Sequence, residues 1–151
     1  MRPDGSDFLI QGESFHLQLP GIFNLENALA AVSAALSQGI ELKTASRALA
    51  QLEKVPGRLD RVENNLGLKI IIDYAVTPDS MEKLGDWAES LKAAGQKIIW
   101  VFGACGQRDR GKRPLMGELG ARYADWVIIT NEDPYGEDPQ AILDEVFSGV
   151  L

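Results

Sequence analysis

The chain has 151 residues, of which 45% are hydrophobic and 25% are charged, and its formal net charge is −7 at pH 7. This composition predicts a globular protein made of one ordinary domain or of pieces of two. The acidic balance excludes a broad basic surface for nucleic acid, and the single cysteine excludes an internal disulfide. Because no apolar run has membrane length and no signal peptide opens the chain, we expect a cytoplasmic protein without a membrane partner.

The first part of the chain predicts a hairpin followed by two helices. Residues 7–19 form two short apolar runs around Gly12 and Glu13, and His16 is expected to be a half-buried or surface strand residue. The one histidine of the chain argues against a histidine-based metal site or a catalytic triad. Residues 23–39 and then 42–53 follow a helical period.

The helix over residues 23–39 has the clearest pattern. Asn24 suits its N-cap and Gly39 the position after its end. Apolar residues at helical spacing predict one inward face, formed by Leu25, Leu29, Val32 and Leu36.

After a linker over residues 55–58, the pattern changes to alternating strands and helices. A hairpin is expected over 59–73, with its turn near Asn64 and Asn65. Strands are expected over 69–73, 97–103 and 125–130, and helices over 78–94, 114–123 and 139–147. Each of these helices has proline at its first position, and Thr77 and Asp138 are the expected N-caps of the first and the third. This order predicts an α/β fold, a Rossmann-like parallel sheet with helices on both faces. Both ends of the chain are typical of a segment cut from a longer protein.

Three loops should meet at one edge of this sheet, since ligands of open α/β sheets bind at the carboxyl ends of the strands. The loops are residues 73–80, 103–114 and 130–139. They offer carboxylates, glycines, helix N-termini and a cluster of guanidinium groups. We therefore expect a polar site for a charged small molecule.

The second loop resembles a phosphate-binding P-loop only in part. Gly106 and Gly111 have the required spacing before Lys112, but Arg113 and Pro114 follow where the pattern needs Ser or Thr. Arginine cannot hold Mg²⁺, and proline removes a backbone N–H from the cradle. The alternative is a basic loop that binds a carboxylate or phosphate, for which arginine is well suited.

Five motifs in order, "GIFNLENALAA", "VPGR", "IIDYAVTPDS", "VFGACGQRDRGKRPLMG" and "TNEDPYGEDP", resemble the Mur ligases of peptidoglycan synthesis, and within them the UDP-N-acetylmuramyl-tripeptide synthetases. The resemblance implies that residues 1–58 are the end of the central ATP-binding domain. Residues 59–151 would then be most of the C-terminal Rossmann-like domain.

The resemblance also implies an activity. Mur ligases activate a carboxylate with ATP and Mg²⁺ and join it to an amino acid, so the expected partners are ATP, a UDP-N-acetylmuramoyl-dipeptide and an amino acid, in a monomeric enzyme. The P-loop, the magnesium ligands and the UDP-sugar domain would lie outside this chain. No catalytic residue is therefore assigned to it, and we expect it to be inactive alone.

Individual residues match positions of the family. Asn24 and Asn27 match asparagines near the adenine, and Arg58 and Asp73 match the pair that contacts ATP, with Asp73 on the ribose. Arg108 matches the arginine that holds a carboxylate of the incoming amino acid.

The amino-acid selectivity loop of the family corresponds to the segment with Glu132, Asp133 and Tyr135. Its sequence here is "EDPY", whereas the family's "DNPR" recognises diaminopimelate. An acidic loop without the arginine predicts a preference for lysine or ornithine. Val76 also departs from the family, which has histidine at that position.

Two other interpretations remain open. A folylpolyglutamate-type ligase shares the C-terminal architecture, although the motifs fit the cell-wall branch better. A stand-alone, non-catalytic module that binds a nucleotide or amino acid is favoured by the absence of a P-loop and by Val76.

Overall fold

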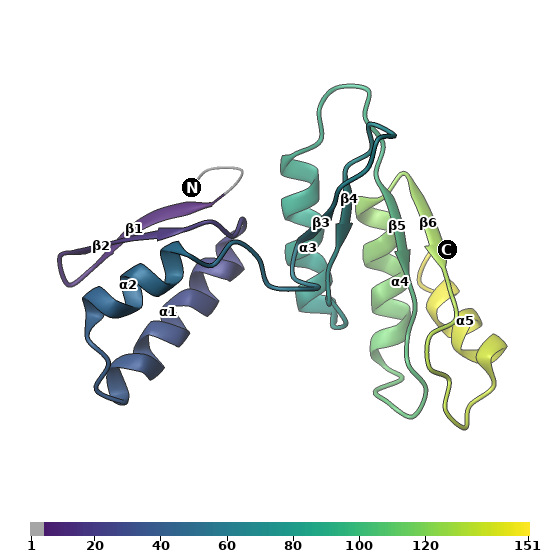
Figure 1. The fold of residues 1–151 in the computed structure, drawn as a ribbon. Coiled ribbons are helices and arrows are strands. Elements are labelled where there is room, and N and C mark those ends of the chain that lie inside the picture. The colour runs from purple at the N-terminus through teal and green to yellow at the C-terminus, as the bar shows by residue number, and fades with distance from the viewer. Residues whose placement is uncertain (1–4) are drawn as a thin grey trace. The chain divides into compact units, whose positions relative to one another are not determined.

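The structure is a computed structural model, and it describes residues 5–151. The chain divides into two compact units, the first ending at Tyr74 and the second spanning Ala75–Leu151. Figure 1 labels the helices and strands of each unit.

The first unit begins with the predicted hairpin. Strands β1 (Ser6–Ile10) and β2 (Glu13–Leu17) pair antiparallel, and both residues of the turn, Gln11 and Gly12, have positive φ, at 49° and 85°. Two left-handed residues give a turn that matches the twist of paired strands. His16 lies on the exposed side of β2, as expected, with Asp7 opposite it on β1.

Helices α1 (Ile22–Ser37) and α2 (Leu42–Ala50) complete this part of the core. Phe15 of β2 clusters with Val32 of α1 and Ala45 of α2. The inward face predicted for α1 is wrong except at Val32. The helix places Ala28 with Leu17 and Val32 with Phe15 in the core clusters, so that Leu29 and Leu36 stay exposed.

The start of α1 also differs from the prediction. Its N-cap is Gly21, with φ of 87°, and Asn24 lies in the first turn instead. Asn24 still serves the helix start, since its side-chain Nδ2 donates to the Pro20 carbonyl oxygen at 2.7 Å. Gly39 follows the helix end with φ of 78°, as expected.

A second hairpin closes the first unit. Strands β3 (Asp60–Val62) and β4 (Ile70–Ile72) pair antiparallel, and the side chain of Asn64 organises the loop between them. Its Nδ2 donates to the carbonyl oxygens of Val62 and Leu68, and its Oδ1 accepts from the amides of Leu66 and Leu68. The strand predicted over 69–73 thus has β3 as its hydrogen-bonded partner.

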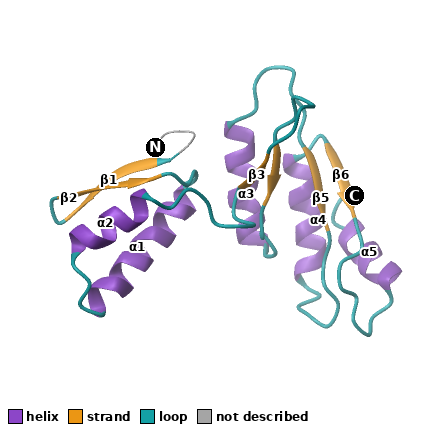
Figure 2. Ribbon diagram, in the orientation of Figure 1, coloured by secondary structure: helices purple, strands orange, loops and turns teal. Residues whose placement is uncertain are grey.

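The second unit contains the parallel sheet. Strands β5 (Ile99–Phe102) and β6 (Trp126–Ile129) pair in parallel, and α4 (Lys112–Tyr123) connects them and runs alongside them in Figure 2. Helices α3 (Pro78–Ser90) and α5 (Pro139–Phe147) pack against α4. The core cluster consists of buried side chains from these helices and the loop after β5, namely Met81, Ala104, Met116, Ile142 and Val146.

The two faces of the β5–β6 pair differ. Trp100, Phe102 and Ile129 pack on the core cluster. The alternate residues face away from it and are at least half exposed in the part of the chain described, namely Ile99, Val101, Trp126 and Ile128. Helical cover on this second face, which the continuous apolar strands predict, does not come from the helices of Ala75–Leu151.

The starts of the three helices are set locally. Thr77 forms a reciprocal capping box with Ser80 at α3, and the Asp138 side chain accepts from the Gln140 amide at α5, both as predicted. The start predicted for α4 at Pro114 is wrong. The helix begins two residues earlier, after Gly111, whose amide donates to the Asp109 carboxylate in a turn that leads into the helix.

Candidate functional site

A cavity in the first unit brings together three of the predicted nucleotide-binding residues. Asn24, Asn27 and Arg58 line a space of about 440 Å³. Its other walls are mostly apolar, from Leu17, Leu19, Ala28, Ala31, Leu49, Leu52 and Val55. Apolar walls with a few polar groups are typical of small-molecule sites.

The two asparagines have different freedom. Asn24 is buried, and its Nδ2 is already bound to the Pro20 carbonyl, so its side chain is fixed in place. Asn27 lies three residues later on the same helix face and is exposed. The amide of Asn27 is therefore the one that can adapt to a ligand.

Asp73 contacts the residue that follows Arg58, and Arg58 contacts the residue that follows Asp73. The Asp73 Oδ2 accepts a hydrogen bond of 2.8 Å from the Leu59 amide, and Leu59 has a positive φ of 47°, uncommon for leucine. The guanidinium of Arg58 lies 5.4 Å from the centre of the Tyr74 ring. Asp73 thus holds the linker in place, and it does not line the cavity of Asn24 and Asn27.

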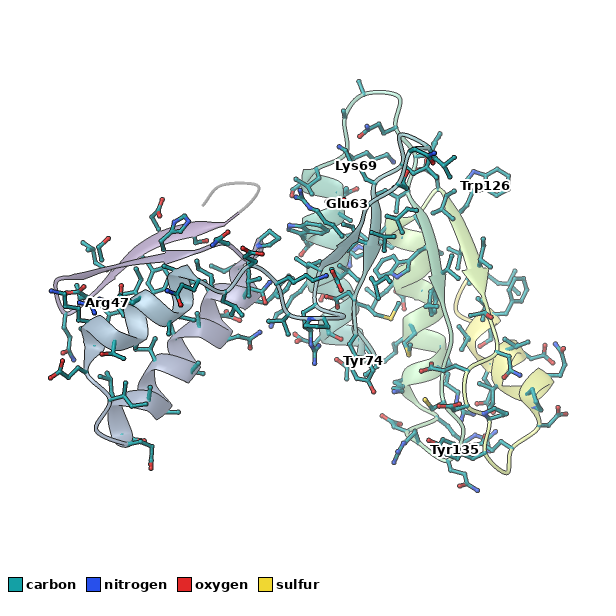
Figure 3. All side chains as sticks on the ribbon, viewed as in Figure 1. Arg47, Glu63, Lys69, Tyr74, Trp126 and Tyr135 are labelled. Carbon is teal, nitrogen blue, oxygen red and sulfur yellow. The ribbon has the colours of Figure 1, made fainter. Side chains whose placement is uncertain are left out.

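The predicted amino-acid residues lie on the loops that follow β5 and β6. These loops are in contact, because the Gly106 amide donates to the Asp133 carbonyl oxygen at 3.0 Å. Gly106 has no room for a side chain, since an added Cβ would be 1.9 Å from the Pro134 carbonyl oxygen. Figure 3 shows Tyr135 on the second loop, at the opposite end of β6 from Trp126. Tyr135 is 61% exposed.

Most of the cations in the first loop are already paired. Arg110 binds Glu145, Arg113 binds Glu137 and Glu145, and the Lys112 Nζ donates to the Val76 carbonyl oxygen at 2.9 Å. Arg108 is exposed, and no residue among 5–151 makes an ion pair with it. Of this cluster, Arg108 is therefore the cation that can bind an added carboxylate.

Acidic groups surround the cysteine between these loops. The pKa of the Cys105 thiol is raised, first by burial and then by its hydrogen bond to Glu132 and the negative charges of Glu132 and Asp133. The thiol is therefore held in its protonated form at neutral pH. Asp133 is exposed, so the second loop presents negative charge, and its backbone is bonded to Gly106, two residues before Arg108.

Arg113, Glu137 and Glu145 form an ion-pair cluster that the sequence reasoning did not predict. Hydrogen bonds from Arg113, and then from the Gln107 amide, lower the pKa of Glu137 to about 2. A signal existed in the sequence. Arg113 precedes Met116, Gly117, Gly120 and Tyr123 at helical spacing, so it lies on the buried stripe of α4.

The described residues contain no metal centre and no membrane-spanning helix. Within residues 5–151, no three His, Cys, Asp or Glu side chains come close enough to hold a metal ion. None of the helices in this range is both long and apolar enough to cross a bilayer.

Comparison with known proteins decides the family. The family model described as "Mur ligase, glutamate ligase domain" matches residues 57–150. The chain belongs to the Mur ligase family. Solved Mur ligases confirm the predicted α/β fold class. MurF from Acinetobacter baumannii matches with a TM-score of 0.70 and 22% identity, and the match covers 97% of this chain and 32% of that chain.

Curated Mur ligases are similar over nearly the whole chain. A UDP-N-acetylmuramoyl-L-alanyl-D-glutamate–2,6-diaminopimelate ligase from Syntrophomonas wolfei is 42% identical, covering 97% of this chain and 30% of its own length. A UDP-N-acetylmuramyl-tripeptide synthetase from Roseiflexus is 46% identical over 88% of this chain and 26% of its own length. The chain thus spans under a third of the relatives it matches.

The fold extends to a neighbouring group of ligases. A folylpolyglutamate synthase from Thermotoga maritima matches with a TM-score of 0.50 at 20% identity, over 91% of this chain and 37% of that chain. At this identity the match shows a shared fold alone. It leaves the choice between the two ligase types to the residues of the site.

Proposed function

We propose that this chain is part of a cytoplasmic, monomeric, ATP-dependent ligase that adds an amino acid to a UDP-N-acetylmuramoyl-dipeptide in peptidoglycan synthesis. Residues 1–58 would be the end of its ATP-binding domain and residues 59–151 part of its C-terminal domain. The family match beginning at residue 57 supports this boundary. The first compact unit extends further, to Tyr74, because the Asp73 carboxylate ties the second hairpin to the linker.

The observation that carries the proposal is the pair of joined loops in the second unit. They combine one unpaired guanidinium, on Arg108, with an adjoining acidic segment over Glu132 and Asp133. Every amino acid brings a carboxylate for which arginine is the preferred partner. The acidic segment would select among amino acids by the charge of their side chains.

The first unit fits part of ATP. The cavity of Asn24, Asn27 and Arg58 suits an adenine ring, and Asp73 keeps a second carboxylate oxygen for a ribose hydroxyl. Residues 5–151 offer no set of metal ligands, so Mg²⁺ would be held by other parts of the ligase. The role of these residues is to bind and orient the nucleoside.

The acidic loop supports an amino acid with a cationic side chain. Relatives that resemble this chain are named diaminopimelate ligases, and diaminopimelate carries a second carboxylate. That carboxylate would face Glu132 and Asp133 without a cation of its own. Arg108 would hold the main-chain carboxylate, and Arg110 and Arg113 are bound to Glu145 and Glu137. An incompletely paired buried anion costs about 1–3 kcal/mol. Lysine or ornithine would instead place an ammonium group against these carboxylates.

The test is an amide-formation assay of the complete polypeptide that carries this segment. It receives ATP, Mg²⁺, the UDP-N-acetylmuramoyl-dipeptide and either lysine, ornithine or diaminopimelate. We expect kcat/KM for lysine or ornithine to exceed that for diaminopimelate by about 5- to 150-fold, equivalent to 1–3 kcal/mol. Tyr135→Arg should shift the ratio toward diaminopimelate, whereas Tyr135→Phe, which adds no charge, should leave it unchanged.

Other outcomes would support the alternatives. If the unmodified enzyme uses diaminopimelate best, our interpretation of the acidic loop is wrong. Glutamate addition to a folate in place of the muramyl substrate would identify a folylpolyglutamate-type ligase. Binding of nucleotide or amino acid without any amide product would identify a non-catalytic binding module.

A further inference from the structure

Arg113 is the one charged residue classed as buried among residues 5–151, with 0% of its surface exposed. It is the second residue of α4, on the face that also buries Met116 and Gly117. A buried charge without partners would be strongly destabilising. The position of Arg113 therefore depends on the groups that surround its guanidinium.

Those groups come from three other segments. Glu137, on the loop after β6, accepts from both terminal nitrogens, at 2.9 Å from Nη1 and 3.0 Å from Nη2. Glu145, on α5, accepts from Nη1 at 2.6 Å, and the carbonyl oxygen of Cys105, on the loop after β5, accepts from Nη2 at 3.1 Å. The two-pronged contact with Glu137 requires the planar geometry of arginine, which lysine lacks.

Glu137 also binds the first loop, so Arg113 restrains that loop through Glu137. Its Oε1, which Arg113 holds, also accepts a hydrogen bond from the Gln107 amide. Gln107 has a positive φ of 51° and directly precedes Arg108. On the second loop, Tyr135 lies two residues before Glu137. The guanidinium of Arg113 is thus connected to both loops through contacts within two residues of Arg108 and Tyr135.

We propose that Arg113 is a positioning residue that fixes the separation between Arg108 and the acidic segment Glu132–Tyr135. It touches neither the substrate nor ATP and acts through the two loops. The inference rests on the proposed function, since it assigns Arg113 to the binding of the amino-acid substrate. It predicts a defect confined to that substrate, which a general loss of stability would not give.

The loop coupling can be tested on the 151-residue chain by hydrogen exchange. Arg113→Met should speed exchange of the Gly106 and Gln107 amides at least about tenfold relative to the Thr130 amide, which is bonded within the sheet to Phe102. Arg110→Met is the matched control, because the Arg110 side chain also pairs with Glu145 but is exposed and makes no hydrogen bond to Glu137 or Cys105. It should leave the Gly106 and Gln107 amides unchanged.

The positioning role is tested by kinetics of the complete polypeptide. Arg113→Met should raise KM for the amino acid about 10- to 100-fold, since misplacement by about 1 Å can cost that much, while KM for ATP stays within about twofold. Arg113→Lys should give a smaller defect. If Arg113→Met does not fold, Glu137→Gln gives the same comparison, because it keeps the side-chain size and removes the charge.

Different results would contradict the loop coupling and the positioning role. Unchanged exchange at Gly106 and Gln107 would overturn the coupling, and a parallel rise of KM for ATP and the amino acid would overturn the positioning role. If the unmodified polypeptide forms no amide at all, the proposed function fails, while the exchange comparison still decides whether Arg113 couples the loops.

Discussion

The contact between the loops after β5 and β6 makes Gly106 a sensitive position. A Cβ added there would lie 1.9 Å from the Pro134 carbonyl oxygen, and real Cβ contacts are essentially never shorter than 3.0 Å. The obstacle is backbone, so Gly106→Ala must separate the two loops by on the order of 1 Å. The 3.0 Å hydrogen bond from the Gly106 amide to the Asp133 carbonyl would then break.

The expected cost follows from these two effects. Overpacking costs about 1–3 kcal/mol and the lost hydrogen bond about 0.5–1.5 kcal/mol, so unfolding of the second unit should become easier by about 1.5–4.5 kcal/mol. For a unit of this size, each kcal/mol lowers Tm by about 4–8 °C. A decrease of roughly 6–36 °C is therefore expected.

The assay is thermal unfolding of the 151-residue chain followed by circular dichroism, with Gly136→Ala as the control. A Cβ at Gly136 would meet only the end of the flexible Gln107 side chain, at 2.9 Å, so its cost should stay below about 0.5 kcal/mol. Equal Tm values for Gly106→Ala and the unmodified chain would refute the close contact between the loops.

Three further predictions follow from other contacts. The purified 151-residue chain should release no phosphate from ATP and bind ATP more weakly than micromolar, since it offers no phosphate cradle; a titration showing tighter binding, about −8 kcal/mol, would contradict this. Hydrogen bonds from arginine lower the pKa of Glu137 to about 2 and also lower the pKa of Glu145. The stabilisation from these two ionised carboxylates is therefore present above about pH 4.5 and is lost as pH falls toward 2. Urea midpoints of Arg113→Met should therefore fall less steeply with acidification than those of the unmodified chain; equal slopes would count against the ion pairs. Tyr123→Phe removes a 2.7 Å hydrogen bond to Asp86 and should destabilise the chain by about 1 kcal/mol in urea unfolding, with no change expected if the bond is absent.

Local chemistry explains what the sequence predicted well. Thr77 and Asp138 marked helix starts because their side chains cap backbone amides within three residues. The turn of the second hairpin was predictable from Asn64, whose side chain makes hydrogen bonds to backbone groups of the loop. Such contacts depend on neighbours in the chain and so leave a clear pattern.

Contacts between distant segments were harder to predict. The elements that pack against α1 determine its buried face. Ala28 and Val32 are buried there and Leu29 is exposed, although leucine is more hydrophobic than alanine. The sequence suggested that Arg113 belongs to a basic anion-binding loop, because its true partners lie 24 and 32 positions further along the chain. For the site, the sequence supplied the residues through family resemblance. It did not show that Asp73 holds the linker through the Leu59 amide.

The apolar outer face of the β5–β6 pair also supplies a natural optical probe. Trp126 is 68% exposed on that face, whereas Trp87 and Trp100 are partly buried. Indole emission shifts to shorter wavelength when water is removed from the ring. Any segment of a longer polypeptide that covers Ile99, Val101 and Ile128 would therefore be detected by Trp126 fluorescence without a label.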